Sequence, residues 1–122
     1  MEIENIKFKA KQLNSGKWFE GDLVRLGNRV CIGGDHIKDG ITDVDPSTVC
    51  MFTGVKDCEG NEIWEGDIIS SPHFERVATV KWDDSLCGFK CSDVTGNINF
   101  SFTAIAHCSE WSIVGNKFDK KK

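Results

Sequence analysis

Apolar and polar residues alternate repeatedly with a period of two along this 122-residue chain, and this pattern limits the possible folds. The clearest stretch is 77–82, where Ala78, Val80 and Trp82 alternate with residues of the opposite face. Such alternation is typical of β-strands, whose successive side chains point to opposite faces of a sheet. No segment longer than about ten residues keeps the spacing of an amphipathic helix. We therefore expect an all-β chain of antiparallel strands.

Turn-forming residues divide this pattern into roughly nine or ten short strands, with a turn about every 6–12 residues. The strands are expected at 6–10, 18–26, 29–32, 49–52, 62–64, 66–70, 76–83, 86–91, 97–102 and 111–115. The segment 33–46, rich in Gly and Asp over 33–45, is expected to be a solvated loop, with a functional loop as the alternative. Its acidic spacing does not fit a helix-flanked calcium loop.

The length fits one domain or two small ones. We expect an N-terminal β-rich subdomain of antiparallel hairpins at 1–60, including the loop 33–45. At 61–122 the order of five strands, with a short helical turn at 103–108 before the last, looks like an Src-homology-3-like (SH3-like) barrel that is partly open. The expected fold is thus an antiparallel barrel extended by a second β-rich part.

The charge and hydropathy of the sequence indicate where in the cell the protein is expected and which ligands it is expected to bind. The longest apolar stretch is far short of the ~20 residues that a membrane span needs, and the acidic start, residues 1–5, has no apolar segment of a secretion signal. We expect a cytoplasmic protein without membrane contact. Fifteen basic residues against nineteen acidic ones give a net charge of −4, which disfavours a broad nucleic-acid footprint. Lys7, Lys9 and Lys11 are expected on the solvated face of the first strand, with a local nucleic-acid site as the alternative.

The chain contains six cysteines. In a reducing cytoplasm free thiols are expected rather than disulfides. If 86–91 is a strand, Cys87, Phe89 and Cys91 share one face and pack in the core. The alternative is a zinc site built from Cys87, Cys91, His107 and Cys108, but structural zinc usually uses a tighter Cys-x2-Cys spacing. We therefore expect no metal and no other cofactor.

The tripeptide Glu-Gly-Asp occurs twice, at 20–22 and 65–67, each time after a tryptophan and before two aliphatic residues. We interpret it as a repeated backbone corner in which Gly bends the strand and Asp bonds nearby amides. The alternative reading makes Glu20, Asp22, Glu65 and Asp67 the carboxylates of a metal or acid–base site.

Catalytic motifs are absent from the sequence: there is no nucleophile elbow, phosphate-binding loop or His-Glu-x-x-His pair. His36, His73 and His107 are scattered, and the neighbours Asp35 and His36 are a poor acid–base pair because adjacent loop residues rarely form one. We predict no catalytic residues and no enzyme activity.

The central stretch 49–69 resembles the hallmark of the YopX family of small phage and prophage proteins. The residues that carry the likeness are Thr53, Gly54, Lys56, Asp57, Gly60, Glu65, Gly66 and Asp67. The opening residues 6–10 and the closing residues 113–116 are also similar to the family pattern. The sequence departs from it at Lys11, at Trp64 and in the loop 33–45. The resemblance implies an all-β fold with an SH3-like part, a phage or prophage context and a bacterial cytoplasm. It transfers no catalytic residues, and we expect the motif residues to be structural.

These observations favour a non-catalytic protein-interaction module that serves as a phage or prophage accessory protein. Aromatic side chains are the usual anchors of protein interfaces. The candidate surface residues are Trp18, Trp64, Trp82 and Trp111. The partner is an unidentified protein or a second copy in a homo-oligomer. A nucleic-acid-binding small barrel is the first alternative, and a metal-assisted or acid–base enzyme is the second.

Overall fold

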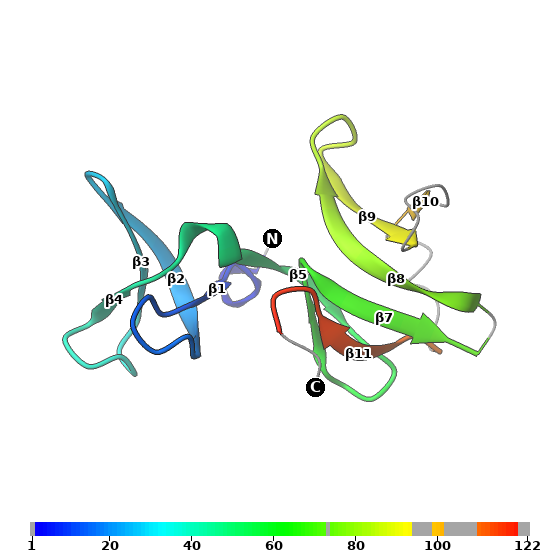
Figure 1. Cartoon of the computed structure of the whole chain (residues 1–122), viewed down its shortest axis with the longest axis horizontal. Helices are drawn as coiled ribbons and strands as arrows, with labels where there is room; N and C mark the ends of the chain where they lie inside the picture. The colour runs from blue at the N-terminus through cyan, green and yellow to red at the C-terminus, as the bar shows by residue number, and fades with distance from the viewer. Residues whose placement is uncertain (1, 73, 94–98, 102–109, 120–122) are drawn as a thin grey trace. The chain divides into compact units, whose positions relative to one another are not determined.

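The computed structural model describes residues 2–72, 74–93, 99–101 and 110–119 (Figure 1). The chain divides into two compact units, Met1–Phe52 and Thr53–Lys122. The boundary expected between residues 60 and 61 lies farther along the chain, in the turn that follows β5. Within the described residues all regular structure is strand apart from two short 3₁₀ helices, so the all-β prediction is confirmed. None of these helices is long and apolar enough to cross a membrane.

The first sheet contains six antiparallel strands in the order β4-β3-β2-β1-β5-β6. Their bounds are β1 Phe8–Lys11, β2 Trp18–Leu26, β3 Arg29–Gly33, β4 Ile41–Asp43, β5 Cys50–Lys56 and β6 Glu62–Trp64. Strand β2 confirms the range expected from the sequence. Strand β5 runs through the boundary of the two units, and its Cys50 and Met51 pair with Lys9 and Phe8 of β1.

The core of the first unit lies on one face of this sheet. Ala10 faces Phe19 across the β1–β2 pair, and Leu23 faces Ile32 across the β2–β3 pair. These residues pack with Val44 and Ile37, which are 1% and 6% exposed. A bridge from Gln12 to Val44 joins the residue after β1 to the end of β4, and Leu13 N–H donates to the Asp43 carbonyl at 3.2 Å. The end of β4 is therefore not a free edge.

The prediction that 33–46 is a solvated loop is wrong in part. The segment contains β4 and is followed by the 3₁₀ helix Pro46–Thr48, which Asp45 caps by accepting the N–H of Ser47 at 3.0 Å. Ile37 is buried within it. A three-residue strand is too short for alternation to reveal it, and one buried isoleucine among Gly and Asp gives no period.

The second sheet contains five antiparallel strands in the order β10-β9-β8-β7-β11. Their bounds are β7 Asp67–Ser71, β8 Phe74–Asp83, β9 Gly88–Asp93, β10 Asn99–Ser101 and β11 Ser112–Asn116. The core of the second unit consists of buried residues from three strands of this sheet, Ile69, Ala78, Val80 and Cys91, together with Ile63 of β6 and Trp111, which precedes β11. As described, the sheet is open between β10 and β11, so closure into a barrel is not part of the observed fold. The helical turn expected at 103–108 lies outside the described residues.

The prediction of a repeated Glu-Gly-Asp corner is correct for the second copy and wrong for the first. Gly66 has φ +89° and turns the chain between β6 and β7, whereas Gly21 lies inside the long strand β2. Gly21 is needed there for a different reason, because a Cβ at this position would collide with the backbone carbonyl oxygen of Gly33. Asp22 is exposed and Asp67 is 3% exposed. The glycine of the same tripeptide thus allows close approach of two strands in the first unit and forms a turn in the second.

Candidate interaction site

Asp57 is a buried carboxylate that organises the turn between β5 and β6. Its Oδ1 accepts the N–H groups of Glu59 and Asn61 at 2.9 and 2.8 Å, and its Oδ2 accepts the N–H of Ile113 in β11 at 3.1 Å. Burial raises the pKa of Asp57, but the hydrogen bonds from Asn61, Ile113 and Glu59 outweigh it and leave the pKa below its ordinary value. The charged carboxylate therefore ties a turn to a distant strand.

The other residues of the first half of the motif shape the hairpin that leads into this turn. Thr53 Oγ1 donates to the carbonyl of Ile63 at 2.6 Å and accepts the N–H of Val55 at 3.2 Å. Gly54 and Gly60 have φ +85° and +87°, a region that favours glycine. Lys56 is exposed. The backbone geometry therefore explains why the motif has glycine at 54 and 60 and threonine at 53.

Asp67 plays the corresponding part in the second half of the motif. Its Oδ2 accepts the N–H of Trp64 at 2.7 Å, and its Oδ1 accepts Nδ2–H of Asn116 at 2.9 Å. Asn116 in turn accepts the N–H of Phe118 at 2.9 Å, and Gly66 accepts the N–H of Lys117 at 2.9 Å. The buried carboxylate thus connects the β6–β7 turn to the end of β11. Glu65 is half-buried beside it.

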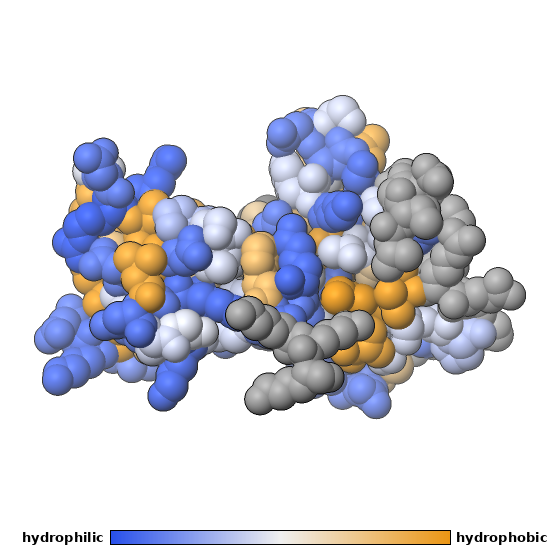
Figure 2. Space-filling view, in the orientation of Figure 1, coloured by the Kyte–Doolittle hydropathy of each residue, from blue (hydrophilic) through white to orange (hydrophobic). Residues whose placement is uncertain are grey.

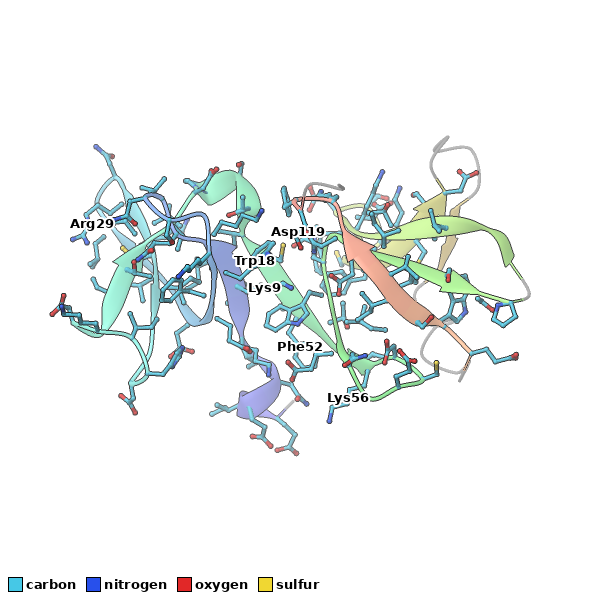
Figure 3. All side chains as sticks on the ribbon, turned by 60° about the horizontal axis from the view of Figure 1, so that its bottom comes forward. Lys9, Trp18, Arg29, Phe52, Lys56 and Asp119 are labelled. Carbon is cyan, nitrogen blue, oxygen red and sulfur yellow. The ribbon has the colours of Figure 1, made fainter. Side chains whose placement is uncertain are left out.

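The four tryptophans differ in their surroundings. Trp64 and Trp111 are 5% and 7% exposed and belong to the core, so neither offers a surface. Trp18 is half-buried on the face of the first sheet opposite the core. Lys9 and Lys11 place their ammonium groups 4.7 and 5.4 Å from its ring centroid, and Figure 3 shows Lys9 beside Trp18. Trp82 is 43% exposed at the end of β8.

Trp82 belongs to an apolar group at the end of the β8–β9 hairpin, which projects beyond the core of the second unit (Figure 1). It faces Phe89 across the two strands, with ring centroids 5.2 Å apart in an edge-to-face arrangement. Leu86, at the turn, is 62% exposed. Hydrophobic atoms reach the surface at this end of the hairpin in Figure 2. We call Trp82, Leu86 and Phe89 the hairpin patch.

The turn beneath this patch is held by several hydrogen bonds. Asp83 accepts both the N–H and the hydroxyl of Ser85, at 2.8 and 2.6 Å, and forms an ion pair with Lys90 at 3.1 Å. The bonds from Ser85 and Lys90 lower the pKa of Asp83 to about 2. Cys87 adopts φ +50° in this turn, so the expectation that it lies on a strand with Phe89 and Cys91 is wrong. A left-handed residue ends the turn and β9 begins only at Gly88.

Lys9 and Lys11 of β1, and Lys7 just before it, lie on the side of the sheet that carries Trp18. Lys7 Nζ is 4.9 Å from the ring centroid of Phe52 and 3.6 Å from a carboxylate oxygen of Glu20. The expected alternation of these lysines with core residues is present, because Phe8 and Ala10 pack on the opposite face. Glu20 thus pairs with a lysine of its own sheet.

The zinc interpretation finds no support in the described part of the chain. Cys91 is fully buried, Cys87 is exposed in a turn, and His107 and Cys108 lie outside the described residues. Within residues 2–72, 74–93, 99–101 and 110–119, no three His, Cys, Asp or Glu side chains form a group that could hold a metal ion. The five described cysteines are free thiols.

The acid–base pair considered for the loop is not assembled either. His36 Nε2 lies 2.6 Å from the backbone carbonyl of Glu20, a contact that fixes the loop against β2. Asp35 is exposed, and no hydrogen bond or ion pair joins its side chain to that of His36. His73 lies outside the described residues.

One cleft of the first unit was not anticipated from the sequence. It encloses about 410 Å³ and combines an apolar wall that includes Leu13, Val30 and Pro46 with an ion pair of Arg29 and Asp43. Arg29 Nε is 2.9 Å from Asp43 Oδ1. The hydrogen bond and the charge of Asp43 raise the pKa of Arg29, and Arg29 correspondingly lowers the pKa of Asp43. The two charged side chains of this cleft thus pair with each other.

A model of the YopX protein family matches residues 4–121. The chain belongs to the YopX family. The match spans both units and both halves of the central motif, which confirms the resemblance seen in the sequence. No curated protein matches the chain.

Seen on the structure, the YopX motif supplies two buried carboxylates, Asp57 and Asp67, whose hydrogen bonds hold β11 in place. Every described buried side-chain nitrogen or oxygen has a hydrogen-bond partner. The residues that sequence reasoning missed are Asp84, Leu86 and Phe89 beside Trp82. A turn with the sequence Asp-Asp-Ser-Leu between two strands could have indicated them, because a leucine in this turn adds to the apolar surface of Trp82 and Phe89 on the flanking strands.

Proposed function

We propose that this YopX protein is a non-catalytic protein-interaction module with an accessory role in a phage or prophage, acting in the bacterial cytoplasm. The observation that carries the proposal is the hairpin patch. It exposes Trp82 and Leu86 on a turn that hydrogen bonds hold in one conformation. Rigid aromatic anchors lose little entropy on binding, and tryptophan is enriched where binding energy concentrates.

The burial of the two motif carboxylates, Asp57 and Asp67, also supports a non-catalytic role. A catalytic carboxylate must reach substrate, whereas Asp57 and Asp67 are buried and accept hydrogen bonds from the chain itself. Trp64 and Trp111 are no longer candidates for the surface, so the interaction is assigned to the exposed end of the hairpin.

The order of strands in the second unit supports an SH3-like architecture for the module. The last strand, β11, pairs with the first, β7, and β8, β9 and β10 follow as a meander. An SH3-like barrel has the same order. Small barrels of this kind commonly bind peptides along their loops and edges.

The proposal is tested by photo-crosslinking in host cells that carry the intact element. A photo-reactive residue replaces Leu86, and a second protein carries the same residue at Lys81, which lies on the opposite face of the hairpin. We expect a defined crosslinked protein, either a partner or a second copy, from position 86 only. The substitution Trp82→Ala should abolish the crosslink while the circular dichroism spectrum stays unchanged. Equal crosslinking from both positions would refute the proposal.

One observation favours a second candidate function, nucleic-acid binding. Lys7, Lys9 and Lys11 form a row of ammonium groups beside the rings of Trp18 and Phe52. Alternating cations and aromatic rings bind single strands by charge and stacking. The discriminating measurement is binding to single-stranded DNA or RNA at several salt concentrations. A steep loss of affinity with salt, weakened further by Lys9→Gln, would favour this function.

A further inference from the structure

Trp82 and Asp84 combine two groups that attract the same kind of ligand. The indole Nε1–H of Trp82 donates to Asp84 Oδ1 at 2.7 Å, so the carboxylate lies at the edge of the ring. An aromatic face attracts cations, and a carboxylate beside it adds a charge partner. We propose that this pair binds an arginine side chain of the protein partner, an inference that rests on the interaction role proposed above.

The side chains of Trp82 and Asp84 are preorganised. Phe89 packs edge-to-face on the Trp82 ring, and the hydrogen bond from Nε1–H to Asp84 fixes the orientation of the indole. Two backbone hydrogen bonds hold the turn itself. Leu86 N–H donates to the Asp83 carbonyl at 3.2 Å, and Cys87 N–H donates to the Asp84 carbonyl at 3.3 Å. A ligand therefore meets a ring and a carboxylate that already have their bound geometry.

The charges of the hairpin are divided between its two faces. Lys81 and Lys90 are direct cross-strand partners, and they lie on the face opposite Trp82 and Phe89. Lys90 is also paired with Asp83. The remaining carboxylate, Asp84, stands beside the exposed ring, and its Oδ2 makes no hydrogen bond to any described residue. The aromatic side of the hairpin therefore presents negative charge.

Trp82 differs from Trp18 in the cations that lie near its ring. Two lysine ammonium groups lie over Trp18, whereas no cation of the described residues lies over Trp82. Arginine suits this position better than lysine because its planar guanidinium stacks on a ring while its edge donates to a carboxylate. The methylene groups of the arginine, and the residues beside it in the partner, would cover Leu86 and Phe89.

The test is a titration of the full-length protein, with ¹⁵N-labelled tryptophan side chains, followed by nuclear magnetic resonance. The probes are N-acetyl-arginine amide, its neutral isostere N-acetyl-citrulline amide, and tetramethylammonium chloride, at constant ionic strength. The Trp82 signal is assigned by its loss in Trp82→Phe. We expect the arginine probe to bind about fivefold more tightly than the citrulline probe, and more tightly than tetramethylammonium.

Asp84→Asn separates charge from shape, because an amide oxygen can still accept the indole N–H. This variant should lose the preference for arginine over citrulline, and Lys81→Ala should keep it. Equal binding of arginine and citrulline, an unchanged preference in Asp84→Asn, or equally tight tetramethylammonium would each overturn the inference. If Trp82→Ala abolishes crosslinking but no arginine preference exists, the interaction role stands and only the arginine site fails. If the arginine preference exists but Trp82→Ala leaves the crosslink intact, the interaction role of the hairpin fails together with the assignment of the arginine to a protein partner, and only the cation-binding property of the pair remains.

Discussion

Asp57 Oδ2 accepts the backbone N–H of Ile113 at 3.1 Å, across 56 residues of sequence. The same carboxylate holds its own turn through Glu59 and Asn61, so one side chain fixes both a hairpin and the last strand of the second unit. A backbone bond from Cys58 N–H to the Trp111 carbonyl at 3.0 Å runs beside it. Asp57, a residue of the family motif, thus connects parts of the second unit that are distant in sequence.

Removal of this carboxylate should destabilise the second unit. Asp57→Ala removes the acceptor of three backbone N–H groups in a partly buried site, and we expect a loss of about 2–4 kcal/mol in the free energy of unfolding. Urea unfolding followed by tryptophan fluorescence measures it. The matched control is Asp22→Ala, an exposed residue of the other Glu-Gly-Asp copy, which should change stability by less than about 0.5 kcal/mol. Equal effects of the two substitutions would contradict the assignment.

The same carboxylate predicts a pH dependence. Because the pKa of Asp57 is lowered in the folded state, its contribution is complete above the unfolded value of about 3.9 and is lost as the pH falls through the lower folded value. The difference in stability between the wild type and Asp57→Ala should therefore shrink in acid. Urea unfolding at several pH values from about 7 to about 3 measures this trend. A difference that stays constant, or grows in acid, would be inconsistent with a lowered pKa.

Two glycines should be intolerant of alanine for different reasons. Gly66→Ala forces a side chain into φ +89° and should cost about 1–2 kcal/mol in the second unit. Gly21→Ala places a Cβ against the carbonyl oxygen of Gly33 and should disrupt the β2–β3 pair in the first unit. Gly115→Ala is the control, because its added Cβ would meet only Ile68, at 4.0 Å. Hydrogen exchange read by mass spectrometry shows which unit is loosened, and loosening of the wrong unit would contradict this prediction.

The cysteines should divide into reactive and protected groups. Cys58 and Cys87 are exposed, whereas Cys31, Cys50 and Cys91 are buried. Burial raises the pKa of Cys91 to about 12 and also raises that of Cys31, so neither forms the reactive thiolate readily. At a pH of about 8, iodoacetamide should modify the exposed pair at least about tenfold faster. Peptide mass spectrometry measures the rates, with protein in concentrated guanidinium as the control. Fast labelling of Cys91 in the native protein would contradict its place in the core.

Much of the fold was predictable because local chemistry determines it. Alternation placed β2 and β8, since each is long enough for the period to show. Short elements such as β4 were missed for the opposite reason. The two copies of Glu-Gly-Asp show the limit most clearly: identical residues lie in a strand at Gly21 and in a turn at Gly66. What differs is the partner strand that approaches each glycine, and no local pattern encodes it.

The β-strand content, the family and the need for glycine at the turns could all be read from the residues in order, because these depend on neighbouring residues and on backbone sterics. Folding was needed to show that Asp57 and Asp67 are buried connections to β11, and that Trp82 is exposed while Trp64 and Trp111 are not. Those outcomes depend on contacts between residues far apart in the chain. The free energy of burying a carboxylate or an indole is set by the groups that surround it after folding.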